Sequence, residues 1–267
     1  MNIMPRQFGF LTELENIQQQ EHFKVLLIGE SCKDIYHYGV CDRLCAEAPV
    51  PVFDYRAEET RPGMAANVRE NLLAYGLDVD FVTNDPDQLI KRRFVDTKSN
   101  QLLLREDLGH QVDAAEIPDC KKYDAVVISD YCKGILDLES ISVLCEKFGG
   151  PVFVDSKNPD LKHFNNAIIK INNDEENKMK SLPDNCELVV TMGKMGAKWK
   201  DNVYRSPQVD VFDVTGAGDV FLATLCYFYL HTRDLNVAIP KAVYLASKSV
   251  QYMGVYKLSH EDIMEVM

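Results

Sequence analysis

The chain has 267 residues, of which 46% are hydrophobic and 26% are charged, and its formal net charge at pH 7 is −12. This length and composition fit one globular domain, residues 1–267, with a sizeable hydrophobic core. The acidic balance and the absence of a basic tract argue against nucleic acid or an anionic membrane as a partner.

Secretion and membrane insertion are also disfavoured. No apolar run is long enough to span a bilayer, and residues 1–20 lack the basic and apolar regions of a signal peptide. Thr12 to Glu15 instead looks like a capping box that begins a short amphipathic helix. The eight cysteines include no CxxC pair and are expected to stay reduced. We therefore expect a cytoplasmic protein.

Strands and helices are predicted to alternate along most of the chain. The apolar run from Lys24 to Gly29 is typical of a strand buried on both faces. Further strands are expected at 35–40, 50–55, 79–82, 125–129, 151–155, 167–171 and 188–191, a hairpin around 94–104, and helices at 65–75, 138–148, from 218 onward and at 237–252. Such alternation predicts an α/β fold with a mainly parallel sheet and helices on both faces.

One group of possible metal ligands lies early in the chain. His37, Cys41 and Cys45 recur every four residues, which would align them on a helix. The surrounding tyrosines, glycine and valine suit a strand and turn better than a helix. Zinc binding is therefore the less favoured interpretation.

Polar residues follow several of the predicted parallel strands, and ligands of such sheets bind beyond the carboxyl ends of the strands. These residues are Ser129-Asp130, Asp155 to Lys157, Asn172 and Thr191 to Gly193. Each alone fits a solvated loop. Their common position at one edge of the sheet favours a binding site there.

The most informative segment is Asp213-Val214-Thr215-Gly216-Ala217-Gly218-Asp219, directly before an apolar helix. Free backbone N–H groups and the helix dipole make such a helix start a ready anion site. Small residues let a phosphate approach closely, and Asp219 could take a proton from a hydroxyl that attacks it. An aspartate there is also a good helix cap, so the segment alone leaves both roles open.

Three tracts together resemble the ribokinase-like (PfkB) family of sugar kinases. The segment from Asp213 to Asp219 resembles the C-terminal signature of the family. Arg61 to Val68 resembles its N-terminal signature, and Gly29-Glu30 with Asp34 resembles its first strand and sugar-binding acid. The resemblance implies a ribokinase-like three-layer α/β fold, with a mainly parallel central sheet and a small β lid.

Other segments narrow the resemblance to the heptose 7-phosphate kinase branch, which includes the kinase half of the bifunctional enzyme that makes ADP-heptose for lipopolysaccharide. They are Asp34 to Gly39, Arg43-Leu44, Glu47 to Val52, Asn100 to Leu102, Arg105, Ser129 to Tyr131, Lys133-Gly134 and Asp155 to Lys157. The implied reaction transfers the γ-phosphoryl group of ATP, with Mg²⁺, to a sugar hydroxyl. The implied acceptor is a sugar phosphate such as D-glycero-D-manno-heptose 7-phosphate.

The resemblance also implies roles for individual residues. Asp219 would be the base, and the amides of Gly216, Ala217 and Gly218 would stabilise the transferring group. The residues implied to bind the acceptor are Asp34, Gly63 and Asn67, with Arg105, Lys157 and Lys133 as candidates to neutralise a phosphate. Those implied on the nucleotide side are Asn172, Glu175, Thr191, Gly193 and Gly196, with Glu175 arranging Mg²⁺ through water. Segments 35–56 and 91–106 would form the lid. The resemblance also leaves open a homodimer formed through the lid.

The chain departs from the family pattern at four places. Met64 replaces the second glycine of a pair and could crowd the sugar or stiffen the hinge, and Glu30 replaces a usual aspartate. Segments 83–90 and 173–185 are shorter than in relatives. These departures keep two alternatives open: a non-catalytic sugar- or nucleotide-binding regulator, and a kinase for an unphosphorylated hexose, pentose or nucleoside.

Overall fold

The computed structural model describes residues 22–267. The capping box expected at Thr12 to Glu15 lies outside the described residues. Within residues 22–267, no helix combines the length and the apolar character needed to cross a bilayer.

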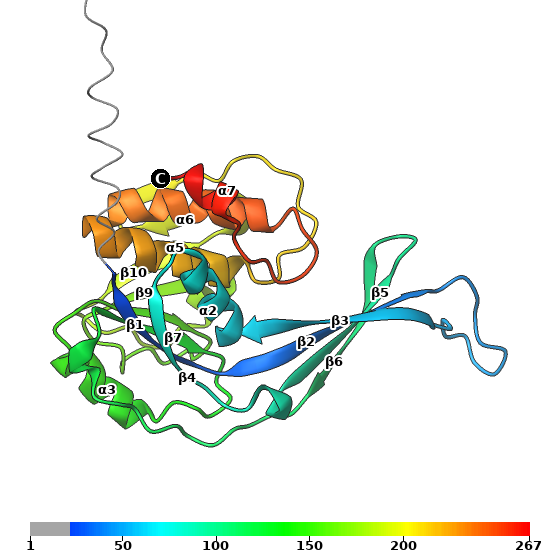
Figure 1. Cartoon of the computed structure of the whole chain (residues 1–267), viewed down its shortest axis with the longest axis horizontal. Helices are drawn as coiled ribbons and strands as arrows, with labels where there is room; N and C mark the ends of the chain where they lie inside the picture. Colours follow the sequence, from blue (N-terminus) through cyan, green and yellow to red (C-terminus); the bar gives the residue numbers. More distant parts are fainter. Residues whose placement is uncertain (1–21) are drawn as a thin grey trace, which may run out of the picture.

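The body of the molecule is built on an eight-stranded sheet with the order β12-β11-β10-β9-β8-β7-β1-β4 (Figure 1). Its parallel strands are β1 (Lys24–Gly29), β4 (Asp78–Val82), β7 (Ala125–Asp130), β8 (Val152–Ser156), β9 (Ala167–Asn172) and β10 (Glu187–Thr191). Two short antiparallel strands, β11 (Ala197–Trp199) and β12 (Asn202–Tyr204), extend one edge. The mainly parallel sheet expected from the sequence is confirmed.

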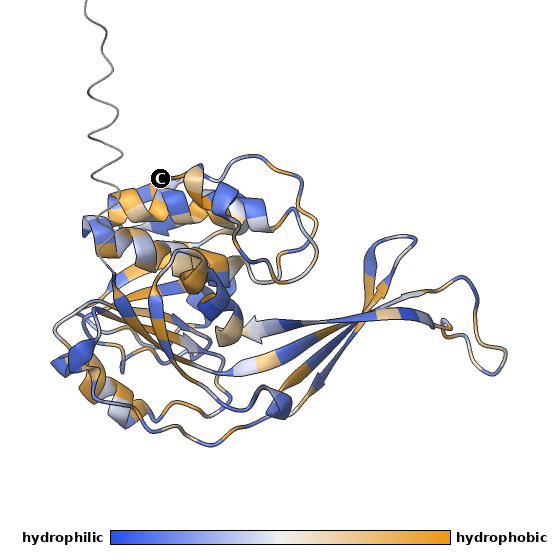
Figure 2. Ribbon diagram, viewed as in Figure 1, coloured by the Kyte–Doolittle hydropathy of each residue, from blue (hydrophilic) through white to orange (hydrophobic). Residues whose placement is uncertain are grey.

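Helices cover both faces of this sheet. One face packs against α2 (Ala65–Ala74), α5 (Ala217–Thr232), α6 (Leu235–Ser249) and α7 (His260–Met264). The other face packs against α3 (Leu138–Lys147). Short helices complete the chain: α4 (Asn173–Lys178), η1 (Pro86–Gln88), η2 (Cys120–Lys122) and η3 (Gly193–Met195). The strands of the body are mainly hydrophobic, as burial on both faces requires (Figure 2). The result is the three-layer arrangement that the family resemblance implied.

A second sheet extends from the body and forms the lid (Figure 1). It has the strand order β3-β2-β5-β6 and consists of β2 (Ser31–Val40), β3 (Asp54–Met64), β5 (Ile90–Asp96) and β6 (Gln101–Leu108). The expected lid segments, 35–56 and 91–106, overlap its four strands, and residues 41–53 form the loop between β2 and β3. The strand expected at 50–55 begins only at Asp54, because Pro49 and Pro51 lack the N–H groups that a strand ladder needs.

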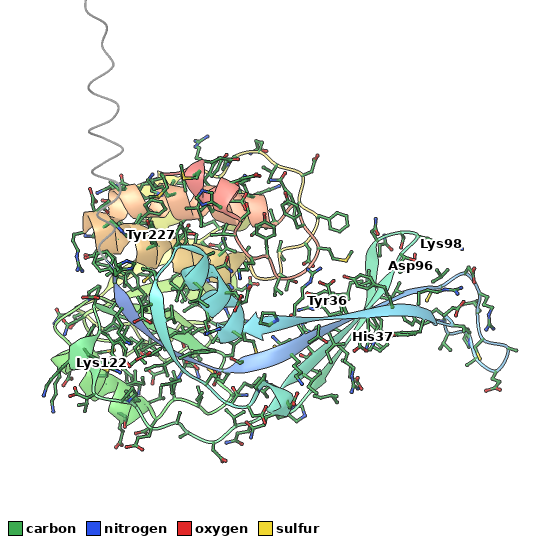
Figure 3. All side chains as sticks on the ribbon, viewed as in Figure 1. Tyr36, His37, Asp96, Lys98, Lys122 and Tyr227 are labelled. Carbon is green, nitrogen blue, oxygen red and sulfur yellow. The ribbon has the colours of Figure 1, made fainter. Side chains whose placement is uncertain are left out.

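The lid sheet has two distinct faces, because residues alternate along each strand. Cys32, Asp34 and Tyr36 on β2 are all at most 2% exposed, and we call the face that carries them the inner face. His37 points to the other face, where its ring stacks on Phe94 with centroids 4.9 Å apart (Figure 3). No group of three or more metal-ligating residues occurs among residues 22–267, and His37 lies in a strand, as expected.

Three of the four connections between the body and the lid are short, and the fourth is the loop 109–119 that follows β6. After the edge strand β4, the chain passes through η1 directly into the lid strand β5. This is the segment that the sequence comparison with the family pattern identified as short. Glu30 alone separates β1 from β2, and α2 begins at Ala65 directly after β3 ends at Met64. The lid is therefore attached to the body at the carboxyl ends of β1 and β4, beside the predicted site.

Candidate active site

The turn before α5 brings the glycine-rich segment to the carboxyl edge of the sheet. Gly216 is the N-cap residue of α5 and has a φ of +79°, which favours glycine. A Cβ at Gly218 would lie 2.7 Å from the Nζ of Lys170, so only glycine allows this ammonium to approach the turn. Contrary to the expectation of free N–H groups here, the amide of Ala217 donates to the Val214 carbonyl at 3.3 Å. The helix start and the ammonium together make this turn suited to an anion.

Asp219 lies in the first turn of α5 and is 4% exposed. Its Oδ2 accepts a hydrogen bond of 2.8 Å from Asn67 Nδ2, and its Oδ1 accepts one of 3.2 Å from the hydroxyl of Tyr131. Burial raises the pKa of Asp219 to about 6, although the hydrogen bond from Asn67 opposes this shift. Asp219 is therefore poised to exchange a proton near neutral pH.

Two lysines lie beside this carboxylate and share one acidic partner. Asp155 is 4% exposed, and its Oδ2 accepts a 2.6 Å hydrogen bond from Lys170 Nζ. Lys157 Nζ lies 3.5 Å from Asp155 Oδ1 and also contacts the Glu175 carboxylate. Burial opposes ionisation of Asp155, but Lys170 and Lys157 outweigh it and hold its pKa below the ordinary value. The cluster carries two positive charges that a phosphate could meet.

Glu175 and Asn172 form a capping box at the start of α4. The Asn172 side chain accepts from the Glu175 amide at 2.9 Å, and Glu175 Oε2 accepts from the Asn172 amide at 2.8 Å. This local arrangement explains the N-x-x-E spacing without a ligand. It leaves Glu175 Oε1 directed at Lys157, beside the cluster described above.

A cavity of about 470 Å³ adjoins the cluster and extends over the carboxyl ends of β9 and β10. The predicted residues that line it are Lys157, Asn172, Thr191, Gly193, Gly196, Gly216, Ala217, Gly218 and Asp219. Its far wall is apolar and includes Val209, Val211 and Val250. This cavity suits a nucleotide, because its polar end beside the helix start matches the phosphates and its apolar wall matches the base. A wider groove of about 1240 Å³ lies near α3, and none of the predicted residues lines it.

On the lid side, Asp34 is tied to an arginine that the sequence analysis did not select. Arg93 Nε donates to Asp34 Oδ1 at 2.7 Å and Nη2 lies 3.3 Å from Oδ2, with both side chains buried. Gly63 lies against this pair, because a Cβ there would be 2.6 Å from Cys32 Sγ and 3.3 Å from Asp34 Oδ2. Arg93 therefore fixes the orientation of the predicted sugar-binding acid.

The structure does not bring Arg105 and Lys133 into the same cluster. Arg105 is exposed on β6, where its Nε pairs with Asp107 at 2.8 Å. The Lys133 amide donates to Glu30 Oε1 at 2.8 Å. The amide of Tyr131 donates to the other oxygen of this fully buried carboxylate. Glu30 thus holds the loop that carries Tyr131, which explains an acidic residue at the end of β1.

The lid is also linked to the turn before α5 through the C-terminal loop. Arg61 Nη1 on β3 donates to the Met253 carbonyl at 2.7 Å. The Gly254 amide donates to Asp213 Oδ2 at 2.8 Å, and Asp213 Oδ1 accepts from the Thr215 amide at 2.9 Å. A continuous set of contacts therefore joins β3 to the turn that precedes α5.

Three side chains near Asp219 or Asp34 received no role from the sequence: Arg93, Tyr131 and Lys170. Lys170 could have been noticed in the sequence, because it interrupts the apolar strand β9. In the structure its side chain is 3% exposed. A buried lysine needs a partner, and strands β8 and β9 are adjacent. Arg93 and Tyr131 had no comparable signal, because their partners lie 59 and 88 residues away in the sequence.

Comparisons with known proteins agree with this geometry. The model of the pfkB family carbohydrate kinases matches residues 63–262. The chain is 31% identical to the bifunctional protein HldE of Nitratiruptor sp., covering 91% of this chain and 64% of that protein. It is 28% identical to HldE of Campylobacter jejuni, covering 94% and 66%. The chain thus spans about two thirds of the length of these relatives.

Solved structures show the same fold at low sequence identity. Phosphofructokinase-2 from Escherichia coli superposes with a TM-score of 0.69 at 16% identity, covering 91% of this chain and 98% of that one. Ribokinase from Arabidopsis thaliana, solved with ribose and ATP, superposes with a TM-score of 0.66 at 14% identity, covering 92% and 98%. With the family model matching most of its length, the chain belongs to the pfkB family of carbohydrate kinases.

Proposed function

We propose that the chain phosphorylates a hydroxyl of a sugar phosphate such as D-glycero-D-manno-heptose 7-phosphate. The main support for phosphoryl transfer is the position of Asp219. This buried carboxylate lies beside a helix start, an ammonium and a cavity suited to a nucleotide. The similarity to HldE proteins and the basic residues of the lid support the choice of acceptor.

In the proposed reaction, the acceptor hydroxyl oxygen attacks the γ-phosphorus of ATP while Asp219 takes the hydroxyl proton. The bond from the γ-phosphorus to its bridging oxygen breaks, and ADP leaves. The amides of Gly216, Ala217 and Gly218, with the Lys170 ammonium behind Gly218, would offset the charge of the transferring group. Asp34 and Asn67 would hold acceptor hydroxyls at the lid side, and Gly63 would let the backbone approach them.

The nucleotide would occupy the cavity of about 470 Å³. Thr191, Gly193 and Gly196 would line its base and ribose portion, and Asn172 and Lys157 its phosphates. Mg²⁺ supplies charge neutralisation for these phosphates when bound. Glu175 fits a contact to the ion through water, because Mg²⁺ keeps several waters and is bound largely by phosphate oxygens. ATP as co-substrate also makes the cytoplasm the compartment that we propose.

Replacing the base tests the proposal. We expect Asp219→Asn to slow ADP release with the acceptor by about 10² to 10⁴, the range for loss of a general base. The folded pKa of about 6 lies above the ordinary aspartate value, so stability falls as pH rises through this interval and the ionised group is destabilising at pH 7. The asparagine variant should therefore melt no lower than the wild type. Turnover near the wild-type rate would refute the assignment of the base.

A second candidate is a regulator that binds sugar or nucleotide without turnover. Its support is that both oxygens of Asp219 already accept hydrogen bonds. Calorimetry with ATP–Mg²⁺ and a panel of sugars, followed by measurement of ADP, separates the two functions. Binding without ADP release for every sugar would favour the regulator.

A further inference from the structure

The cations near the acceptor side are nearly all paired with carboxylates. The pairs are Arg61 with Glu59, Arg93 with Asp34, Arg105 with Asp107, Lys157 with Asp155 and Glu175, and Lys170 with Asp155. Lys91 differs from this group. Among residues 22–267, no carboxylate lies within ion-pair distance of its ammonium.

Lys91 lies on the inner face of the lid. It is directly opposite Asp34 in the ladder between β2 and β5, so the two side chains leave the sheet on the same side. Its side chain is half-buried, and its Nζ lies 5.2 Å from the centre of the Tyr131 ring. Its cross-strand neighbours on this face, Asp34 and Asp107, are paired with Arg93 and Arg105. The ammonium therefore lies against an aromatic ring without an ion pair of its own.

Tyr131 relates this ammonium to the proposed base. Its ring lies beside Lys91, while its hydroxyl donates to Asp219 at 3.2 Å. Lys91 and Asp219 therefore both contact the same tyrosine side chain, one at its ring and the other at its hydroxyl. A sugar that lies along this side chain can place a hydroxyl at one end and a charged substituent at the other.

We infer that Lys91 binds the phosphate group already present on the acceptor, at the end of the sugar remote from the hydroxyl that reacts. The inference rests on the proposed function and assigns the acceptor class of the same site. A phosphate supplies the counter-charge that Lys91 lacks, and lysine binds phosphate as a point charge. An unphosphorylated sugar would leave the half-buried ammonium unpaired and would be disfavoured for that reason.

Two of the three cations chosen from the sequence, Arg105 and Lys157, are less suited to this role. Arg105 shares the inner face with Arg93, but it is exposed and already paired with Asp107. Lys157 Nζ also lies near the Tyr131 ring, 5.6 Å from its centroid, but it is held by two carboxylates. A phosphate at either residue would have to displace an existing ion pair.

Three methionine variants test the assignment. Lys91→Met removes the proposed phosphate ligand, and Arg105→Met removes the rival cation on the same face. Lys33→Met is the matched control, because Lys33 is a neighbouring lid lysine on the outer face, paired with Asp87. Each variant is assayed for ADP release with D-glycero-D-manno-heptose 7-phosphate, fructose 6-phosphate and the two unphosphorylated parent sugars. Binding of each sugar is also measured by calorimetry without nucleotide.

We expect Lys91→Met to raise KM and Kd for the phosphorylated sugars by about 10- to 100-fold, as loss of a charged hydrogen bond implies, with kcat and the values for the parent sugars little changed. Lys33→Met should match the wild type, and Lys91→Arg should recover most of the binding. Equal losses for phosphorylated and parent sugars would overturn the inference, as would a larger effect of Arg105→Met. So would a wild-type protein that binds neither sugar phosphate. ADP release with any parent sugar would still uphold a sugar kinase, so failure of this inference is distinguishable from failure of the kinase proposal.

Discussion

At the scale of single residues, the proposed role of Asp219 depends on its pKa, on which burial and hydrogen bonds have opposite effects. Burial disfavours the carboxylate, whereas the donors on Asn67 and Tyr131 favour it. The result is a pKa of about 6, so most of the group is ionised at pH 7. We therefore expect kcat/KM to rise with pH through about 6 and then to level off.

Removing the Tyr131 hydroxyl should move this pH profile. Tyr131→Phe deletes one donor to the ionised form, so the pKa of Asp219 should rise by about half a unit to one unit, given ~0.5–1.5 kcal/mol for one hydrogen bond. The acidic limb of kcat/KM should shift to higher pH by the same amount. Tyr123→Phe is the matched control, because the Tyr123 hydroxyl donates to Asp80 on β4 instead. An unshifted profile for Tyr131→Phe would mean that this hydroxyl does not tune the base.

Residues of the site were predictable where a local pattern marks them. Asp219 and the small residues before it were visible because they are consecutive in the sequence. Arg93 was not, because its role comes from lying beside Asp34 in a parallel pair of strands that only the folded lid creates. Arg105 was selected instead because its segment follows the family pattern, but a strand pattern does not reveal that Asp107 neutralises it.

At the scale of elements, the junction between β3 and α2 shows unusual backbone geometry. Met64 has φ 60° and ψ −133°, a conformation that normally requires glycine. Its side chain is 3% exposed and packs with Leu89, Val112 and Ile135. The sequence suggested that Met64 could crowd the sugar, and the structure instead places its side chain in this apolar cluster. The packing offsets the backbone strain.

Two substitutions separate the strain from the packing. Both Met64→Ala and Met64→Gly lose a buried side chain, which costs about 2–5 kcal/mol. Only glycine also relieves the positive φ, which is worth about 1–2 kcal/mol. Met64→Gly should therefore be less destabilised than Met64→Ala, although glycine usually destabilises more than alanine. Urea unfolding monitored by circular dichroism measures the difference, and the reverse order would show that the junction is unstrained.

Most elements of the body follow from the sequence, because buried parallel strands are continuous apolar runs. β1 occupies the predicted residues, and α2 ends one residue before the prediction. β11 and β12 were missed, since strands of three residues have too few positions for a period to appear. α4 was also missed, because its six residues are polar and no apolar face marks it.

At the scale of the whole molecule, the lid ends in an edge strand with apolar side chains in solvent. Leu102, Leu103 and Leu104 on β6 are 52%, 41% and 59% exposed. An edge strand with such side chains is suited to pairing with another chain. We therefore propose a homodimer through the lid, in agreement with the option left open by the sequence.

Sedimentation or light scattering tests the dimer. We expect the wild type to be dimeric at micromolar concentration, and Leu103→Asp combined with Leu104→Asp to be monomeric, because two charges would be buried in the interface. Val143→Asp is the control, since Val143 is 47% exposed on α3, far along the chain from the lid. A monomeric wild type, or dissociation by the control alone, would rule out this interface.

The contacts from Arg61 to Met253, and from Gly254 to Asp213, have a consequence for the fate of ATP. The turn that would receive the γ-phosphate is braced by the same loop that holds β3. If the lid swings away when no acceptor is bound, that brace is lost and the turn relaxes. Water that enters the open site would then find the catalytic groups out of position. ATP would therefore not be hydrolysed before a sugar binds.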